Sequence, residues 1–365
     1  MRKKILVLSN FPAPYRVAVF KGISKDCDTD IYFAYKTDDD RNIDYTVSDR
    51  ELKYTILDSK EANKKFRKDI QNLKKYDMIL AYDWYLSYAL KVIFKAYILK
   101  IPFAINCDGA FLPEEMNIKQ KIKDLVKSFV VRHACLCFAS GEYARRYFKY
   151  YGAQDDKIIG YNFTSLDEKN IRKTPPTSRE KQTTKNELGL KDYTTFISVG
   201  QFIYRKGYDI LLEAWGDLDK NNQLVIIGGG RLEQEYYNII QKKQYKNVVI
   251  EKFKPKETIF KYYTAADVFV LPTREDIWGL VINEAMASGL PIICSNKCVA
   301  GLEYIKNEEN GYIVPLNARE LHNKMKILST NLLQRISMGE KNCKKMNECT
   351  LEKVSENHLQ NIYRI

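Results

Sequence analysis

Short apolar runs alternate with helical patterns along the chain, and this alternation restricts its fold more than any other feature. In the first half, the runs KKILVLSN, DMILAYD and PFAINCD are each followed by a helical pattern, near residues 16–24, 85–99 and 118–133. A second series begins at TTFISVG and continues through NQLVIIGGG, DVFVLPT and LPIICS. Strands that alternate with helices are typical of parallel sheets covered on both faces. The order therefore predicts an α/β fold with two doubly wound, Rossmann-like domains.

A polar stretch separates the two series. Residues 171–190 read IRKTPPTSREKQTTKNELGL and include two adjacent prolines. We therefore predict an N-terminal domain at 1–170, a linker at 171–190, a C-terminal domain at 191–345 and a helical tail at 346–365. A chain of 365 residues is long enough for two domains that each bury a core.

The charge of the chain is uneven. Through Leu190 we count 35 Lys+Arg against 25 Asp+Glu, which gives +10, and the remainder has 24 against 21, which gives +3. Together these recover the formal net charge of +13. A basic first half favours an anionic partner such as nucleic acid, an anionic membrane surface or a phosphorylated substrate. The alternative is an AT-rich genome that overuses lysine.

The sequence predicts a cytoplasmic protein, with the inner face of the membrane as a second location. The first ten residues, MRKKILVLSN, have too short an apolar run for a signal peptide and no small-residue cleavage site follows, so we interpret them as a first strand. No run of about eighteen uninterrupted apolar residues predicts a membrane-spanning helix. The eight cysteines have no paired C-x2-C spacing and the chain has three histidines, which favours reduced structural thiols over a zinc site.

The stretch TREDIWGLVINEAMASGLPI, residues 273–292, combines a loop rich in acids with a helix. It follows the apolar run VFVLP, so its first residues should form the loop beyond the carboxyl end of a buried strand. The following helix would end at Gly289, where an αL cap fits. Its first amides, near Gly279 and Leu280, should favour an anion. Glu284 would lie about one and a half turns into this helix, where contact with a ligand and a structural ion pair are both open.

The same stretch resembles the motif of the retaining glycosyltransferases of family four, which have the two-domain GT-B fold. Residues 276–292, DIWGLVINEAMASGLPI, match the family pattern of two glutamates separated by seven residues. The resemblance implies two Rossmann-like domains that face each other across a cleft. It makes Glu284 a ligand of the donor ribose hydroxyls, since a carboxylate can accept from two vicinal hydroxyls. The family's first glutamate, near the transferred sugar, falls on Asp276, and Glu275 is the alternative for this catalytic position.

A second segment, SVGQFIYRKGYDILLEAW, resembles the part of the family that binds the donor diphosphate. Lys206 matches the family lysine after Gly200, but Gln201 stands where the family has arginine, and Arg205 is the candidate for the missing charge. Two cations can neutralise the charge that develops on the leaving diphosphate. A solvated basic turn is the alternative. The remaining donor-binding candidates are Gly229 in the turn IIGGGRLEQEY and, in the acidic loop, Trp278, Gly279 and Leu280.

The N-terminal half is expected to hold the acceptor. Arg16 lies just after the first strand and is a candidate contact for phosphate or acceptor, with a surface role as the alternative. Asn106 and Asp108 lie at the carboxyl end of the strand expected in PFAINCD, and Asn106 is a further candidate contact for phosphate or acceptor. Family members have a His or Asp near this point beside the reacting centre, so the resemblance makes Asp108 a catalytic candidate. The alternative is a turn formed by Asp108 and Gly109.

The helical pattern IKQKIKDLVKSFVVRH, residues 118–133, places apolar residues on one face and five cations elsewhere. Such a helix could lie on an anionic membrane surface or near a pyrophosphate-linked lipid acceptor. It could equally pack on the sheet with a solvated, lysine-rich face, and we slightly favour this second interpretation.

The resemblance implies a retaining glycosyltransferase that moves a sugar from a nucleotide sugar, by default a uridine diphosphate donor, to a bacterial surface glycan or its lipid-linked precursor. We expect no metal and no cofactor. No D-x-D motif, the usual metal-binding motif, occurs where a GT-B cleft would use one, since the acidic run at 38–40 lies in an early polar loop. No G-x-S-x-G motif supplies an enzyme nucleophile. The alternative is a non-catalytic nucleotide-sugar-binding subunit of another transferase. An epimerase would need further acid–base residues, and a nucleic-acid binder would not explain the acids, so we expect no nucleic-acid partner.

Overall fold

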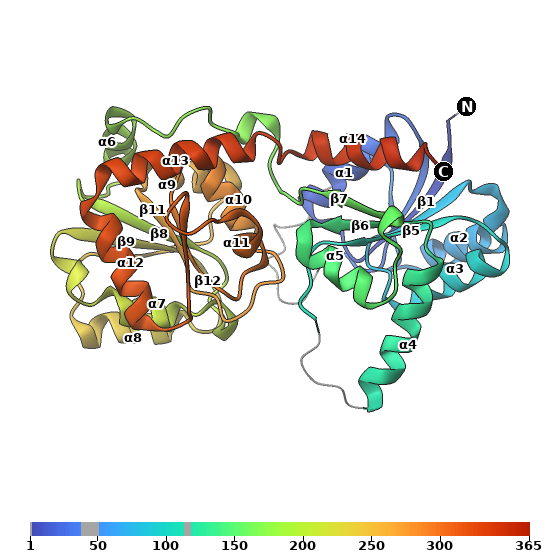
Figure 1. Ribbon diagram of the computed structural model, residues 1–365, viewed down its shortest axis with the longest axis horizontal. Helices are drawn as coiled ribbons and strands as arrows, with labels where there is room; N and C mark the ends of the chain where they lie inside the picture. Colours follow the sequence, from blue (N-terminus) through green and yellow to red (C-terminus); the bar gives the residue numbers. More distant parts are fainter. Residues whose placement is uncertain (1, 38–50, 113–117) are drawn as a thin grey trace. The chain divides into compact units, whose positions relative to one another are not determined.

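A computed structural model describes residues 2–37, 51–112 and 118–365 of the chain. The chain divides into two compact units, each built on one sheet (Figure 1). Unit 1 comprises Met1–Ser165 and Thr350–Ile365, and unit 2 comprises Leu166–Cys349. The acidic run at 38–40 lies outside the described residues.

Within the described residues, the sheet of unit 1 has seven parallel strands in the order β3-β2-β1-β4-β5-β6-β7. Its strands are β1 (Lys4–Ser9), β2 (Asp28–Phe33), β3 (Thr55–Ile56), β4 (Met78–Ala81), β5 (Phe103–Cys107), β6 (Leu136–Ser140) and β7 (Ile158–Tyr161). Strands β4 and β6 are buried at every residue. Burial on both faces is the reason that these strands appear in the sequence as continuous apolar runs.

The α-helices of unit 1 are α1 (Pro14–Ser24), α2 (Lys60–Gln71), α3 (Ser87–Ile98), α4 (Ile118–His133), α5 (Gly141–Tyr150) and α14 (Leu351–Ile362). Helix α14 comes from the end of the chain and packs on α1. A β-carbon at Gly22 of α1 would lie 2.3 Å from the Ser355 hydroxyl of α14, so glycine permits this close approach. The expected tail is therefore not a separate segment: from Thr350 onward it belongs to unit 1.

The sheet of unit 2 has six parallel strands in the order β10-β9-β8-β11-β12-β13. They are β8 (Thr194–Val199), β9 (Asn222–Gly228), β10 (Val248–Lys252), β11 (Val268–Leu271), β12 (Ile292–Ser295) and β13 (Gly311–Val314). The α-helices are α6 (Ser178–Glu187), α7 (Tyr208–Trp215), α8 (Glu233–Lys243), α9 (Lys256–Ala265), α10 (Leu280–Ala287), α11 (Val299–Tyr304), α12 (Ala318–Thr330) and α13 (Leu332–Met346). Among the described residues, none of the helices has the length and apolar character needed to cross a bilayer.

The expected linker at 171–190 instead contains α6, a folded part of unit 2. The helix begins with a capping box, in which the Thr177 hydroxyl accepts from the Glu180 amide and the Glu180 carboxylate accepts from the Thr177 amide. These hydrogen bonds, led by the one from the Thr177 backbone, lower the pKa of Glu180 to about 2. The polar composition misled the sequence-based prediction because, of its side chains, only Lys185 is buried.

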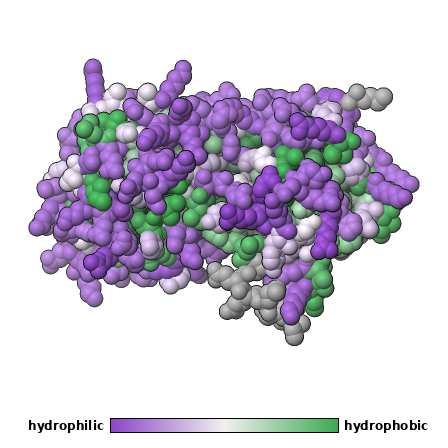
Figure 2. Space-filling model, in the orientation of Figure 1, coloured by the Kyte–Doolittle hydropathy of each residue, from purple (hydrophilic) through white to green (hydrophobic). Residues whose placement is uncertain are grey.

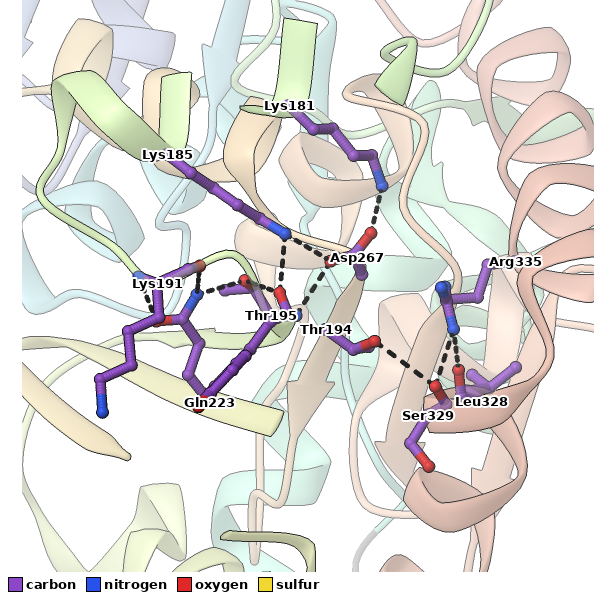
Figure 3. A network of polar contacts seen from close by, with 11 residues as sticks. Lys181, Lys185, Lys191, Thr194, Thr195, Gln223, Asp267, Leu328, Ser329 and Arg335 are labelled. Atoms are coloured by element: carbon purple, nitrogen blue, oxygen red, sulfur yellow. Dashed lines mark hydrogen bonds and ion pairs between the residues drawn. The ribbon is translucent and has the colours of Figure 1, made fainter. Parts of the chain in front are cut away.

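Two lysines of α6 attach this helix to the sheet (Figure 3). Lys181 and Lys185 lie 2.7 Å and 3.2 Å from the two carboxylate oxygens of Asp267, just before β11. The same carboxylate accepts a hydrogen bond from the Thr195 amide of β8. Burial alone would raise the pKa of Asp267, but Lys181 and Lys185 lower it below its usual value. Asp267 therefore joins α6, β8 and β11 through charge rather than through apolar packing.

Candidate active site

Three segments of unit 2 meet beyond the carboxyl ends of β8, β9 and β11. The first segment, residues 200–207, ends in the short 3-10 helix η5 (Tyr204–Lys206), and the second is the glycine turn at 228–230. The third is the acidic loop at 273–279. The Phe202 amide donates to the Gly229 carbonyl at 2.8 Å, and the Arg274 amide donates to the Arg205 carbonyl at 2.7 Å. Backbone hydrogen bonds thus fix the three segments to one another within unit 2.

Lys206 and Asp276 form a buried ion pair at this edge. The Lys206 ammonium lies 2.5 Å from one carboxylate oxygen of Asp276, and both residues are buried. The Arg205 guanidinium lies 3.6 Å from the other oxygen and also donates to the Glu275 carbonyl at 2.7 Å. The structure thus brings together both cations and the in-register acid of the sequence analysis. Two cations around one carboxylate leave net positive charge, which suits an anionic ligand.

The structure distinguishes the two candidate acids. The Asp276 side chain is buried, whereas that of Glu275 is exposed. Asp276 is held by its backbone, since its amide donates to the Lys297 carbonyl at 2.8 Å and its own carbonyl accepts from the Val299 amide at 3.1 Å. Its carboxylate is therefore the one directed at Lys206.

The start of α10 is shaped by Gly279 and Trp278. Gly279 has φ +94°, and a β-carbon there would lie 2.7 Å from the Cys298 sulfur, so a side chain is excluded on both counts. The Trp278 indole is buried, packs edge-on against Tyr304 and donates to the Asn283 amide oxygen at 3.2 Å. The Trp278 indole therefore packs inside unit 2 and positions the loop, and the expected contact of Trp278 with the donor stays a prediction. Leu280 is the first residue of α10, where backbone amides lack acceptors within the helix.

Glu284 lies on α10 and is oriented by a tyrosine that the sequence analysis missed. The Tyr263 hydroxyl of α9 donates to the Glu284 carboxylate at 3.3 Å. Burial, followed by the charge of Glu284, raises the pKa of Tyr263 well above its usual value, so the phenol stays protonated and remains a donor. No motif in KYYTA marks Tyr263 as functional.

Arg274 is a second residue that the sequence analysis missed. Its guanidinium makes two hydrogen bonds, at 2.8 Å and 2.6 Å, to the Asp209 carboxylate of α7. It also lies 3.8 Å from the ring centre of the exposed Tyr204. The hydrogen bonds that Arg274 donates to Asp209 raise the pKa of Arg274, and the pair joins the start of α7 to the acidic loop.

The two glycines Gly228 and Gly229, in the turn at the end of β9, have different roles. A β-carbon at Gly228 would lie 1.9 Å from the Gly200 carbonyl oxygen, so Gly228 permits the contact between β9 and the end of β8. Gly229, the expected donor-binding residue, has no atom within 4 Å of such a β-carbon. The space beside Gly229 therefore lets another molecule approach the backbone closely.

In unit 1 the structure brings together Arg16, Asn106 and Asp108, the three candidates of the N-terminal half. The Arg16 guanidinium makes two hydrogen bonds to the Asp108 carboxylate, one of them at 3.3 Å. The Asn106 amide nitrogen and the Tyr161 hydroxyl donate to the same carboxylate at 2.6 Å and 2.7 Å. Burial alone would lower the pKa of Arg16, but Asp108 raises it above its usual value, so the guanidinium stays charged.

His358 of α14 completes this cluster and had no signal in the sequence analysis. Its ring stacks on Phe138, with centroids 4.0 Å apart, and its Nε2 lies 3.4 Å from the Asn106 amide oxygen. Burial lowers the pKa of His358 to about 4, so the imidazole is neutral at pH 7. The last helix of the chain thus supports the same carboxylate cluster as β5 and β7.

All eight cysteines are free thiols, and six of them are buried. Cys298 lies beside the acidic loop, where its thiol donates to the Trp278 carbonyl. Burial raises the pKa of Cys298 to about 12, so it acts as a small packing residue rather than as a nucleophile. In the part of the chain that the structure describes, no three His, Cys, Asp or Glu residues group as metal ligands would.

Comparison with known proteins identifies the family. Residues 180–345 match the model of the family described as "Glycosyl transferases group 1". This segment, which forms most of unit 2, belongs to the group 1 glycosyltransferases. The chain is 30% identical over 178 residues to an uncharacterized glycosyltransferase of Haemophilus influenzae, covering 47% of this chain and 50% of that protein. It is 29% identical over 247 residues to the uncharacterized glycosyltransferase MJ1178 of Methanocaldococcus jannaschii, covering 65% and 66%.

The alignments with these first two relatives thus span half to about two thirds of their lengths. A third relative is an uncharacterized 41.2 kDa protein in the cps region of Klebsiella pneumoniae. The chain is 25% identical to it over 254 residues, which is 67% of each chain.

Solved structures confirm the expected fold class. Anabaena Alr3699/HepE, crystallised in complex with UDP, superposes with a TM-score of 0.80 at 15% identity, covering 99% of this chain and 100% of that one. Sucrose-phosphate synthase from Thermosynechococcus elongatus gives 0.75 at 18% identity, covering 100% and 98%. The two Rossmann-like units therefore have the GT-B fold.

Proposed function

We propose that this protein transfers a sugar from a nucleotide-sugar donor to a bacterial surface glycan or its lipid-linked precursor, with retention of anomeric configuration. One observation carries the proposal: the buried Lys206–Asp276 pair lies beyond β8 and β11, with Arg205 beside it. A diphosphate placed there would share Lys206 and Arg205 with Asp276, and the first amides of α10 would add positive partial charge. The relative in the cps (capsular polysaccharide) region supports a glycan acceptor.

The donor nucleotide is proposed to be a uridine diphosphate. Support comes from Anabaena Alr3699/HepE, which shares the fold and was crystallised with UDP. In this assignment Glu284, oriented by Tyr263, accepts hydrogen bonds from the ribose hydroxyls. The space beside Gly229 would admit the nucleotide close to the backbone.

The chemistry would need no enzyme nucleophile. As the bond from the sugar to the diphosphate breaks, the acceptor hydroxyl attacks the anomeric carbon from the same face, and its proton passes to a diphosphate oxygen. Lys206 and Arg205 stabilise the charge on the leaving diphosphate, the task that a metal ion performs in other transferases. Asp276 fills the first acidic position and holds Lys206. The Arg16–Asp108 cluster of unit 1 is assigned to the acceptor side.

The deciding experiment is an assay of sugar transfer and donor hydrolysis against a panel of nucleotide sugars. Glu284→Ala should lower donor use by about 2 kcal/mol in kcat/KM, roughly thirtyfold, because ribose hydrogen bonds are lost. The matched control is Glu340→Ala, since Glu340 is an exposed glutamate of α13 in the same unit. Wild-type kinetics in Glu284→Ala would contradict the assignment. Binding of a nucleotide sugar without any turnover would favour the alternative function, a non-catalytic subunit of another transferase.

The expected absence of a metal requirement is tested in the same assay. Activity should persist in excess EDTA, because the positive charge comes from Lys206, Arg205 and backbone amides. Loss of transfer on chelation, with recovery on adding Mg²⁺ or Mn²⁺, would refute the metal-independent mechanism while leaving the donor assignment intact.

A further inference from the structure

The outer surface of α3 and α4 in unit 1 exposes large apolar side chains. Ile98 is 76% exposed, Leu125 72% and Ile122 61%. Phe94 and Tyr97 of α3 are also exposed. In the space-filling view, green hydrophobic residues lie beside purple hydrophilic ones over the lower part of α4 (Figure 2). We refer to Phe94, Tyr97, Ile98, Ile122 and Leu125 as the α3–α4 surface.

Ring contacts make this surface continuous. Phe129 of α4 packs on Phe94 and Tyr97 of α3, with ring centroids 5.2 Å and 5.0 Å apart. Leu125 and Ile122 precede Phe129 by four and seven residues, so they lie on the same face of α4, one and two turns further along. The apolar face therefore runs from α3 onto the exposed first half of α4.

Packing within unit 1 explains only the second half of α4. Val130 and Val131 are fully buried in the core of unit 1, whereas residues 121–123 and Leu125 are exposed. The first half of α4 extends beyond the sheet of its unit (Figure 1). The favoured interpretation of the sequence, a helix packed on the sheet, therefore accounts for residues near 130 and leaves Ile122 and Leu125 without a structural reason to be apolar.

The charges around the α3–α4 surface are almost all positive. Helices α3 and α4 together contain seven Lys and Arg residues, two in α3 and five in α4, and a single acid, Asp124. Asp124 accepts hydrogen bonds from Gln120 and Tyr151 within unit 1, so its carboxylate faces the protein's own donors. Lys91, Lys121 and Lys123 are exposed beside the apolar side chains. Cations beside exposed leucine, isoleucine and aromatic residues are typical of segments that lie in the interface of an anionic bilayer.

We propose that the α3–α4 surface docks unit 1 on an anionic lipid surface. Ile122, Leu125 and Ile98 would enter the boundary between headgroups and acyl chains, and the neighbouring lysines would pair with lipid phosphates. A second copy of this chain is a poorer occupant, since two such surfaces would bring like charges together. The proposal does not depend on the proposed reaction, because none of these residues belongs to the candidate active site.

The test measures how the full-length protein partitions onto sedimented vesicles. We expect binding to vesicles of phosphatidylglycerol and phosphatidylcholine, much weaker binding to phosphatidylcholine alone, and release as salt screens the lysines. Ile122→Ser with Leu125→Ser should weaken the partition coefficient tenfold or more. Lys121→Glu with Lys123→Glu should weaken it by at least a similar factor, because two attractive charges become repulsive.

Matched controls come from unit 2. Leu333→Ser removes an apolar side chain that is 80% exposed on α13, and Lys242→Glu with Lys243→Glu reverses two exposed charges on α8. Both controls should bind as wild type. The substituted side chains are exposed, so circular dichroism and donor hydrolysis should be unchanged in every variant, and the charge variants retain the apolar residues in case the serine variants unfold.

Three kinds of result would overturn the proposal. The first is a lack of specific binding: either the wild-type protein does not bind phosphatidylglycerol vesicles, or the α3–α4 variants and the unit 2 controls bind them equally. The second is self-association that sedimentation velocity detects and that Ile122→Ser with Leu125→Ser abolishes, which would make the surface an interface between copies. The third is binding to soluble polyglutamate as strong as to the vesicles and insensitive to the serine changes, which would identify an acidic polypeptide as the occupant.

Discussion

The substitution Asp108→Ala should destabilise unit 1 by more than the loss of an exposed ion pair would. Asp108 accepts hydrogen bonds from Arg16, Asn106 and Tyr161. The alanine variant leaves the Arg16 guanidinium, whose side chain is 6% exposed, without its carboxylate partner. Breaking a buried ion pair by removing one partner typically costs about 3–5 kcal/mol, because the remaining charge stays desolvated.

The structure places the expected cost at the lower end of that range. The Asp108 side chain is 18% exposed, so water can enter the space that the carboxylate leaves and solvate Arg16 in part. We therefore expect a loss of about 3 kcal/mol in the free energy of unfolding of unit 1. For a unit of this size, that corresponds to a decrease of roughly 6–12 °C in Tm.

Urea denaturation followed by tryptophan fluorescence measures this loss. The two units need separate probes because they can unfold independently. Trp84 is buried in unit 1, so a Trp215→Phe/Trp278→Phe background, which removes the tryptophans of unit 2, makes the signal specific to unit 1. The control is Glu142→Ala, which breaks the exposed Arg146–Glu142 pair and should cost less than about 1 kcal/mol.

A double variant separates the charge effect from general damage. Arg16→Met with Asp108→Ala removes both charges, so it should be more stable than Asp108→Ala alone by about 1–2 kcal/mol. Equal losses in Asp108→Ala and Glu142→Ala would refute the reasoning. So would a double variant whose loss is the sum of the two single losses, because the two side chains would then be energetically independent.

Three further outcomes follow from single groups. Burial lowers the pKa of His358 from 6.5 to about 4, so the unfolded chain takes up a proton at a higher pH than the folded chain does. The contribution of His358 to the stability of unit 1 should be complete above pH 6.5 and fall by up to about 3 kcal/mol toward pH 4. In His358→Phe, the urea midpoint should lose this dependence on pH. Gly228→Ala should lower the Tm of unit 2, because its β-carbon meets the Gly200 carbonyl, whereas Gly229→Ala should keep the Tm and weaken donor binding in calorimetry. Asp267→Asn should destabilise unit 2 by about 3 kcal/mol, since two lysines of α6 lose their carboxylate; an unchanged urea midpoint would argue against this charge-based attachment.

The central strands of both sheets could be predicted from the sequence because parallel strands buried on both faces are apolar runs. Strands β3 and β7, at the two edges of the first sheet, were missed. Strand β3 has two residues, and β7 has the sequence IIGY with an exposed glycine, so neither forms a long apolar run. Helix α6 was predicted as linker because lysine stems and the charges at their ends, rather than apolar side chains, attach it to unit 2.

The motif residues were predictable, but their pairing was not. Lys206 and Asp276 are 70 positions apart, and only the hydrogen bonds between η5 and the acidic loop bring them to 2.5 Å. One part of the arrangement could have been inferred. The acidic loop has an extended backbone where Asp276 forms a β-bridge with Cys298. Exposed and buried side chains therefore alternate from Glu275 to Trp278, and the side chains of Asp276 and Trp278 both point inward. Placing the large tryptophan inside would have assigned Glu275 to the outside.

The carboxylate cluster of unit 1 shows why sequence reasoning found half of each candidate site. Arg16 and Asp108 follow strands and could be placed at the sheet edge by topology, whereas Tyr161 and His358 come from an edge strand and from the end of the chain. His358 lies 252 positions from Asn106, yet it packs against it because α14 returns to α1. Burial keeps the His358 imidazole neutral, and burial together with Asp108 raises the pKa of the Tyr161 phenol well above its usual value. Neither side chain therefore adds a charge to the cluster in the physiological pH range. The geometry of Asp108 therefore depends on the last helix, and substitutions in α14 would act on the candidate acceptor side through this packing.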